Sequence, residues 1–216
     1  MLLQWCLKGI AASKEFDDQA AADALNGGGL ASAWLRGNAK SNLLQGIAGS
    51  HVILSQATLD AHVNNFGVAQ AKTPYISLSA GCVTSDPVTG KTTVHSALDT
   101  AIGFATGAVW GKAHKGYVFS LWVLVTPKPA PELPGFGEEV RDLNQFHQFG
   151  LYHHEGEVAA KLIVPHRQIE YVEKYDESGA SQPVNWSAFG LTQTSNRGAN
   201  REFVSPERVN NLREMI

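Results

Sequence analysis

The sequence predicts an α+β domain in which a mixed, split β-sheet is combined with helices near the N-terminus. The strongest signal is the run GYVFSLWVLVTP at residues 116–127, which is dense in β-branched and aromatic residues and reads as a central strand. The other candidate strands lie far from it and from one another in the chain. Two or three candidate helices come early and one falls between strands, which favours α+β over alternating βα units.

The first third of the chain is predicted to be mostly helical. Residues 13–26 are rich in Ala, with Ser13 as a possible N-cap and a Gly-Gly-Gly run directly after them as a stop. A second helix is predicted over 30–44. The β-branched run HVILSQ at 51–56 predicts a strand, and 58–67 predicts a further helix that ends on a glycine.

The middle of the chain alternates strands and breakers. Residues 74–81 predict a short strand, and the next twelve residues contain Asp86-Pro87 and Gly90, which is typical of turns. Apolar residues at helical spacing predict a helix over 94–110. Four prolines between 127 and 134 predict an extended loop after the central strand, and EVRDLNQF a short helix.

The last third is predicted to hold two strands and a polar tail. The run VAAKLIVP, residues 158–165, and the run at 167–176 both read as strands. The tail carries a helical signal only at SPERVNNLREMI, residues 205–216. We therefore expect an N-terminal helical region over 1–47, a core over 48–176 and a C-terminal extension over 177–216.

Composition excludes several classes of protein. The chain has 216 residues, a net charge of −3 and a pI near 6.2, so it has no electrostatic footprint for duplex nucleic acid. Cys6 and Cys82 are its two cysteines, which argues against a disulfide framework and a zinc site and favours a reducing compartment. No hydrolase elbow, phosphate-binding loop or HExxH motif is present. The N-terminus lacks a signal or membrane segment, which predicts a cytoplasmic chain or one delivered into a target cell.

The pair Glu155 and Glu157 is the most informative polar motif. Residues two apart in an extended strand project from one face, so both carboxylates are expected to share a cleft if the strand includes them. Paired acids suit proton capture and stabilisation of a developing cation. The alternative is a solvated strand end with two surface acids.

The order of these pieces resembles the ADP-ribosyltransferase fold of NAD-dependent bacterial mono-ADP-ribosyltransferase toxins. A strand ending Ser-x-Ser (Ser77 and Ser79), an Ala/Phe helix, the strand GYVFSLWV and then Glu-x-Glu ahead of a strand follow one another over about residues 48–176. The resemblance implies a split-sheet core that takes NAD as a substrate, without a Rossmann-type phosphate site.

The resemblance also implies roles for single residues. Glu157 would be the catalytic glutamate, hydrogen-bonding a ribose hydroxyl of NAD and favouring the oxocarbenium ion that forms as nicotinamide departs. Glu155 would hold an acceptor guanidinium and take its proton. Ser77 and Ser79 would position this glutamate or the nicotinamide ribose. Tyr75 would stack on nicotinamide or pack in the core.

The first motif of the family departs from the pattern. Members specific for arginine carry an Arg on the first strand, and another class carries a His. The predicted strand HVILSQ offers His51, with Ser55 or Gln56 under a tighter alignment and Arg36 just upstream. We take His51 as the first-motif residue, and the missing arginine leaves arginine specificity open.

The segment before the Glu pair corresponds to the acceptor loop of such enzymes. Phe149 and Tyr152 are its candidate recognition residues, since an aromatic ring can pack on an arginine or stack on a base. The alternative is that the phenylalanines of this segment form the inner face of a helical turn. His153 and His154 are interpreted as polar loop residues and not as metal ligands.

The sequence thus predicts a mono-ADP-ribosyltransferase acting on a macromolecular acceptor, either a protein arginine or a single-stranded nucleic acid, in a toxin or phage-defence setting. Two alternatives stay open: an NAD glycohydrolase and a catalytically inactive interaction domain of the same fold. A neutralising antitoxin or immunity protein is implied by the resemblance. Neither a metal nor a membrane is expected as a partner.

Overall fold

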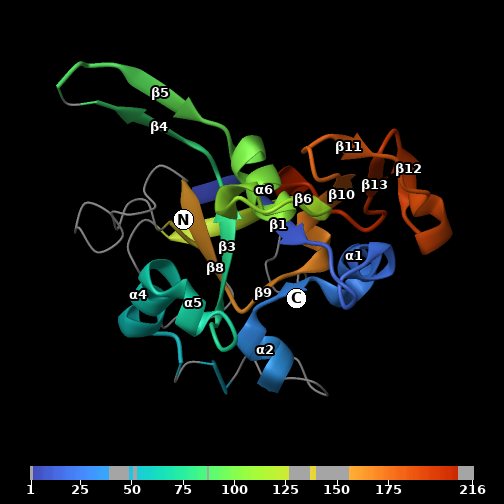
Figure 1. Cartoon of the computed structure of the whole chain (residues 1–216). Helices are drawn as coiled ribbons and strands as arrows, with labels where there is room; N and C mark the ends of the chain where they lie inside the picture. Colours follow the sequence, from blue (N-terminus) through green and yellow to red (C-terminus); the bar gives the residue numbers. More distant parts are fainter. Residues whose placement is uncertain are drawn as a thin grey trace. The chain divides into compact units, whose positions relative to one another are not determined.

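A computed structural model describes residues 2–38, 49–50, 53–86, 88–126, 137–139 and 156–208 (Figure 1). Its contacts divide the chain into two compact units. Unit 1 comprises residues 1–4, 31–95 and 123–164, and unit 2 comprises residues 5–30, 96–122 and 165–216. The three consecutive segments expected from the sequence, 1–47, 48–176 and 177–216, stay a prediction.

Unit 1 is built around three strands and a helix. Its elements are β3 (Tyr75–Ser79), β4 (Cys82–Ser85), β5 (Thr92–His95), β7 (Gly137–Glu139), β8 (Glu157–Lys161), β9 (Ile163–Val164), α2 (Ala33–Asn38), α4 (Gln56–Asn64) and α5 (Phe66–Ala69). Strand β8 lies between β3 and β7 and is antiparallel to both. The core contains Leu59 and Val63 of α4 packed with Tyr75 and Ala159 of the sheet.

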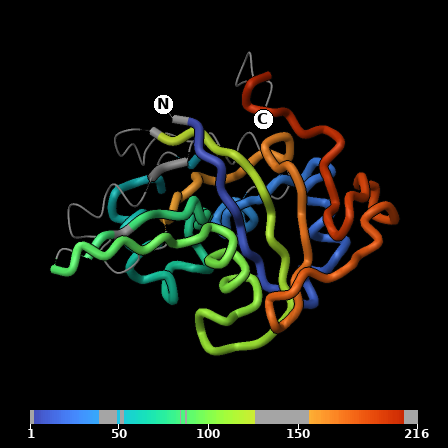
Figure 2. Tube along the Cα trace, turned by 90° about the horizontal axis from the view of Figure 1, so that it is seen from above, coloured from blue at the N-terminus to red at the C-terminus, as the bar shows by residue number. Residues whose placement is uncertain are grey.

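Unit 2 contains further strands of the large sheet and a helix that packs on one face of them. Its elements are most of β1 (Leu2–Ala11), α1 (Asp18–Asp23) with the π-helical turn η1 (Ala24–Gly28), the first residue of β2 (Leu30–Ala31), α6 (Ala97–Thr106), η3 (Ala108–Trp110), most of β6 (Gly116–Thr126), η6 (His166–Gln168), β10 (Ile169–Tyr175), β11 (Ser181–Gln182), η7 (Trp186–Phe189), β12 (Thr192–Thr194), β13 (Arg197–Ala199) and η8 (Pro206–Arg208). Figure 2 shows β1, β6 and β10 running side by side.

Two glycines let α6 lie close against this sheet. A Cβ added at Gly9 would come 2.1 Å from the carbonyl oxygen of Ala101, and one at Gly116 would come 2.1 Å from that of Ala105. The helix is therefore in backbone contact with β1 and β6, and small residues at these positions are required. The same face buries Val118 and Tyr175 under the helix.

The pairing pattern fits a mixed sheet. Strand β6 pairs with β7 in parallel, while the pairings of β10 with β6, β11 and β13 are antiparallel. The chain is thus an α+β protein with a large, mainly antiparallel sheet, which confirms the predicted fold class at that level. The split of the sheet stays a prediction.

Most strands predicted from the sequence are confirmed. Strands β3, β6 and β10 lie where their β-branched runs predicted them, and VAAKLIVP forms β8 and β9 on either side of Leu162, which has φ +63°. The helix predicted over 13–26 is present but starts at Asp18, because Asp17 and not Ser13 caps it by accepting a hydrogen bond from the Ala20 amide.

Several predictions are wrong in part. Residues 53–55 are a turn and not a strand, and Gln56 is the first residue of α4. The turn-rich segment after β3 forms a β-hairpin of β4 and β5, and β5 includes residues 94 and 95, so that the helix predicted over 94–110 starts only at Ala97. Residues 2–11 are a strand that the sequence did not predict. The helix expected over 30–44 starts at Ala33 and is described to Asn38, and the C-terminal helical signal starts with a 3₁₀ turn at 206–208; the rest of both predictions lies outside the described residues.

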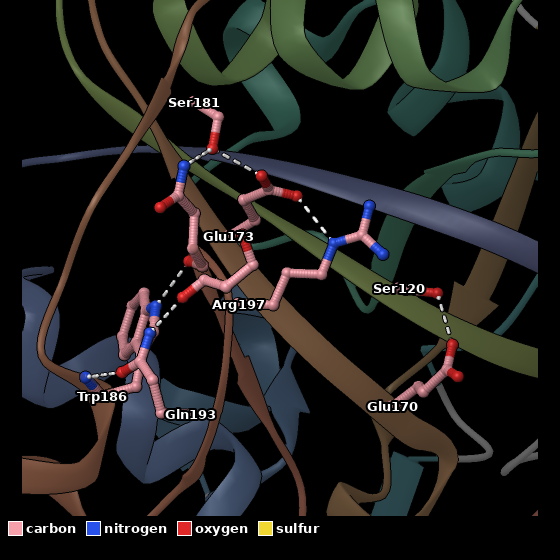
Figure 3. Close-up of polar contacts among 9 residues, drawn as sticks. Ser120, Glu170, Glu173, Ser181, Trp186, Gln193 and Arg197 are labelled. Carbon is pink, nitrogen blue, oxygen red and sulfur yellow. Dashed lines mark hydrogen bonds and ion pairs between the residues drawn. The ribbon is translucent and has the colours of Figure 1, made fainter.

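Within unit 2, a polar network connects the C-terminal tail to β10 (Figure 3). The Glu173 carboxylate of β10 is 7% exposed, accepts a hydrogen bond from Ser181 Oγ at 2.5 Å and pairs with Arg197 Nε at 3.0 Å. The Arg197 guanidinium also stacks over the Tyr171 ring at 4.2 Å. Its hydrogen bond to Glu173 raises the pKa of Arg197, and burial together with that carboxylate raises the pKa of Tyr175 to about 12.

We expect Arg197→Met to lower the free energy of unfolding by about 1–2 kcal/mol, because it leaves the buried Glu173 carboxylate without its cation. The half-exposed position of Arg197 keeps the loss below that of a fully buried pair. Thermal unfolding at low and high salt measures the effect. Arg201→Met is the control, since Arg201 is exposed and makes a single 3.5 Å contact; equal losses in both variants would show that the ion pair contributes nothing.

Candidate active site

The candidate site is built on the β3–β8 ladder of unit 1. In this antiparallel register Ser79 lies opposite Glu157, and Ser77 lies opposite Ala159. Residues directly opposite each other project from the same face, and so do residues two apart along one strand. Ser77, Ser79 and Glu157 therefore share one face.

Glu157 is a buried carboxylate with few protein contacts. Only 8% of the residue is exposed, and among the described residues its Oε1 lies 3.6 Å from His62 Nε2, a distance too long for a hydrogen bond. Ser79 is also 8% exposed. Within the part of the chain that the structure describes, neither the Glu157 carboxylate nor the Ser79 hydroxyl has a hydrogen-bond partner. Buried polar atoms are normally paired, so the face is suited to a ligand that carries hydroxyl groups.

His62 is placed against this face by α4. A capping box starts the helix: Ser55 Oγ accepts from the Thr58 amide, and the Ser55 amide donates to Thr58 Oγ1. Leu59, His62 and Val63 then follow at helical spacing and are all buried on the side that packs on the sheet. The imidazole, 2% exposed, contacts Thr73 Oγ1 through Nδ1 at 2.8 Å and Ser77 Oγ through Nε2 at 2.9 Å.

These contacts select one tautomer of His62. The Thr73 hydroxyl accepts the Tyr75 amide proton at 3.2 Å, and no acceptor for its own proton other than His62 Nδ1 lies among the described residues. The hydroxyl therefore donates to Nδ1, which leaves the ring proton on Nε2 for donation to Ser77. The hydrogen of the Ser77 hydroxyl is then directed away from the ring and is available to a ligand.

Two aromatic rings flank the imidazole. Tyr75 lies 5.6 Å from it, is 2% exposed and donates its hydroxyl to the Ser55 carbonyl at 3.3 Å, so its ring belongs to the core cluster of unit 1. Phe66 lies edge-on at 5.5 Å and is 44% exposed. Of the two roles expected for Tyr75, its burial favours core packing, and Phe66 is the ring exposed beside the site.

Several predicted site residues lie outside the described residues: His51, Phe149, Tyr152 and Glu155. The alternatives for the first motif are placed elsewhere. Ser55 is the N-cap of α4, Gln56 is its first residue, and Arg36 is exposed on α2, where Nη1 donates to the Ala31 carbonyl at 2.5 Å.

That Glu155 and Glu157 share a strand face stays a prediction, because Glu155 lies outside the described residues. Strand β8 begins at Glu157, and Gly156 before it has φ +58°, in the left-handed region.

Sequence reasoning missed two features. The first strand of the chain is β1 and not HVILSQ, and its one basic residue is Lys8; five large apolar residues in ten were the available signal. His62 was also missed, although it falls at the buried spacing between Leu59 and Val63. A polar residue in the apolar stripe of a helix is the signal that could have found it.

For the NAD cleavage that the sequence resemblance implies, we expect His62→Phe to lower turnover by about 10–100-fold, because misplacing a reacting group by a fraction of an ångström has effects of this size. The phenyl ring keeps the packing against Phe66 and Tyr75 but loses both hydrogen bonds. His62→Gln, whose amide can still donate toward Ser77, should lose less. Nicotinamide release and thermal unfolding are both measured. Wild-type turnover in the Phe variant would show that His62 contributes only packing.

A metal site and a membrane-spanning helix are both absent from the described residues. Among the described residues, no group of three or more His, Cys, Asp or Glu side chains is placed to hold a metal ion. No helix in the same part of the chain is long and apolar enough to cross a membrane.

Comparison with known proteins gives similarity in fold only. No protein-family model matches the chain, and no curated protein matches it. A variant of the heat-labile enterotoxin A subunit matches with a TM-score of 0.49 at 14% identity over 95% of this chain and 79% of that one. A mutant of the E. coli heat-labile enterotoxin gives 0.48 at 11% identity over 95% and 80% of the two chains. EcPltA gives 0.43 at 11% identity over 94% and 88%. Because these TM-scores lie below 0.5, the function has to be argued from the residues of the site.

Proposed function

We propose that this chain is a mono-ADP-ribosyltransferase that moves ADP-ribose from NAD to a macromolecular acceptor. One observation carries the proposal: the Glu157 carboxylate and the Ser79 hydroxyl are nine-tenths buried, share a sheet face and lack hydrogen-bond partners in the described residues. A ribose presents adjacent hydroxyls that can donate to the carboxylate and exchange a hydrogen bond with the serine.

The chemistry follows from a fixed negative charge beside a sugar. When the bond between C1′ of the ribose and the nicotinamide nitrogen breaks, its electron pair leaves with nicotinamide and C1′ becomes cationic. The Glu157 carboxylate, already desolvated, stabilises that charge without reorganisation. An acceptor atom then forms the new bond to C1′ and loses its proton to a carboxylate, the role that we propose for Glu155.

The rest of the site supports this step by positioning. The Tyr75 amide donates to the Thr73 hydroxyl, which donates to His62, and His62 donates to Ser77. These hydrogen bonds fix the Ser77 hydroxyl on the sheet face that also carries the Glu157 carboxylate. We propose that Ser77 and Ser79 orient the nicotinamide ribose. The acceptor roles of Phe149 and Tyr152 remain proposals, as does a toxin or defence setting with a neutralising partner protein.

The test is incubation of the full chain with NAD labelled in the adenylate, with and without a whole-cell lysate. Released nicotinamide reports cleavage, and label in macromolecules reports transfer. Label removed by protease identifies a protein acceptor, and label removed by nuclease identifies a nucleic-acid acceptor. Nicotinamide release without any transfer would make the chain an NAD glycohydrolase. No release at all would refute the proposal.

A further inference from the structure

Strands β4 and β5 form a separate two-stranded sheet with a well-ordered turn. Val83 lies opposite Val94, and Ser85 lies opposite Thr92. The Asp86 carboxylate accepts the amide protons of Val88 and Thr89 at 2.7 and 3.0 Å, and these bonds lower the pKa of Asp86. Gly90 closes the turn with φ +68°. The hairpin is therefore held in shape by its own turn.

Its surface is unusually apolar and open. Val83 and Val94 are a cross-strand pair on one face and are 63% and 75% exposed, and Val88 at the tip is 91% exposed. Neither strand pairs with any other strand in the described residues. An isolated hairpin of this size is marginal in water, and natural edge strands are usually protected by charges, proline or a bulge. The strands CVTS and TTVH carry no lysine, acid or proline.

The base of this hairpin lies at the candidate site. Two residues separate Ser79, opposite Glu157, from Cys82 at the start of β4. The Ala80 amide donates to the Gly156 carbonyl at 2.9 Å, so the base is fixed to the residue that precedes Glu157. In Figure 1 β4 continues from the end of β3, away from α4, and β5 runs back beside it. A chain lying along β4 therefore leads to the Glu157 carboxylate over about six residues, roughly 20 Å.

The charge of the hairpin indicates what it binds. Residues 82–95 contain one acid, Asp86, and one lysine, Lys91, so they offer a phosphate backbone no net attraction. Exposed valines need an apolar partner, and open strand edges bind extended polypeptide by adding a strand. A second copy of this chain would meet the same needs, but it would not account for the hairpin arising beside the catalytic strand.

Building on the proposed function, we propose that the β4–β5 hairpin is the docking arm for a protein acceptor. An extended segment of the acceptor adds as a strand to the hairpin, its apolar side chains cover Val83 and Val94, and its modified residue is delivered to Glu157. The acceptor is therefore a protein and not a nucleic acid.

The test uses the double variant Val83→Thr, Val94→Thr. Threonine keeps the shape and the β-branching of valine, so the hairpin should stay folded while its face becomes polar. We expect protein-bound label from nuclease-treated lysate to fall at least about tenfold, since losing two buried valines at an interface has effects of this order. Nicotinamide release without lysate should stay within about twofold of wild type, because neither valine belongs to the catalytic face. Val109→Thr, at another valine that is 49% exposed, is the matched control.

Four results would overturn the docking role. Protein labelling by the double variant as strong as that by wild type would show that the two valines do not bind the acceptor. Label sensitive only to nuclease would move the acceptor to nucleic acid. Conversion of a dimer into a monomer by the double variant, seen by light scattering, would make a second copy the occupant. An absence of nicotinamide release from wild type would instead refute the proposed function, on which the docking role depends.

Discussion

Replacement of Glu157 by glutamine should lower NAD cleavage by about 10²–10³-fold, the size of effect seen when one preorganised electrostatic group is removed from an active site. Glutamine has nearly the same shape, so the β3–β8 ladder should be unchanged. It lacks the negative charge that stabilises C1′ as nicotinamide leaves. Nicotinamide release at saturating NAD measures the loss.

The stability of the same variant separates a catalytic role from a structural one. Glu157 is buried with a 3.6 Å contact to His62 and no hydrogen bond within the described residues, so it contributes little to folding. We expect Glu157→Gln to unfold at the wild-type temperature or slightly above it, as is usual for groups kept for function. Glu177→Gln, at an exposed acid, is the control for charge. Wild-type cleavage in Glu157→Gln would end the catalytic assignment.

The parts of the fold that sequence predicted well have strong local signals. Strands β3, β6 and β10 are runs of β-branched and aromatic residues, whose pattern suits a half-buried or buried strand wherever it lies. Ser77 and Ser79 could be assigned to one face by spacing alone. That they lie on the face of Glu157 depends on the register of β3 with β8, which only the structure supplies.

The wrong predictions arose where local preference competed with capping and turn chemistry. The run at 51–56 has the composition of a strand, but Ser55 and Thr58 form a capping box that starts α4. Leu54, 2% exposed, packs into the core directly before this helix. In the hairpin, Asp86 and Gly90 were correctly taken as turn residues, but the flanking Val and Thr residues are the strands that the turn joins.

His62 shows why a site is harder to predict than a fold. Its contacts join α4 to Thr73, just before β3, and to Ser77 within β3, which are 11 and 15 residues away in the chain. Nothing in the helix pattern specifies which strand lies below it, since packing partners depend on the whole topology. The sequence therefore predicted the carboxylate and the hydroxyls but not the histidine that orients them.

Gly156→Ala should be the most damaging single substitution near the site. Gly156 has φ +58°, and a Cβ there would come 2.3 Å from the Gly81 carbonyl oxygen. The left-handed backbone costs a non-glycine residue about 1–2 kcal/mol, and forcing the two backbones apart adds about 1–3 kcal/mol. We therefore expect the free energy of unfolding to fall by about 2–5 kcal/mol.

Gly90→Ala separates these two contributions. Gly90 has φ +68° but nothing within 4 Å of an added Cβ, so this variant carries the backbone strain without the clash. Chemical denaturation of both variants should show a clearly larger loss for Gly156→Ala, and equal losses would mean that the two backbones do not approach so closely. Because Gly156 directly precedes Glu157, its variant should also lose NAD cleavage at temperatures where it is still folded, whereas Gly90→Ala should keep it. This result would show that the close contact between Gly81 and Gly156 keeps the Glu157 carboxylate on the sheet face that it shares with Ser79.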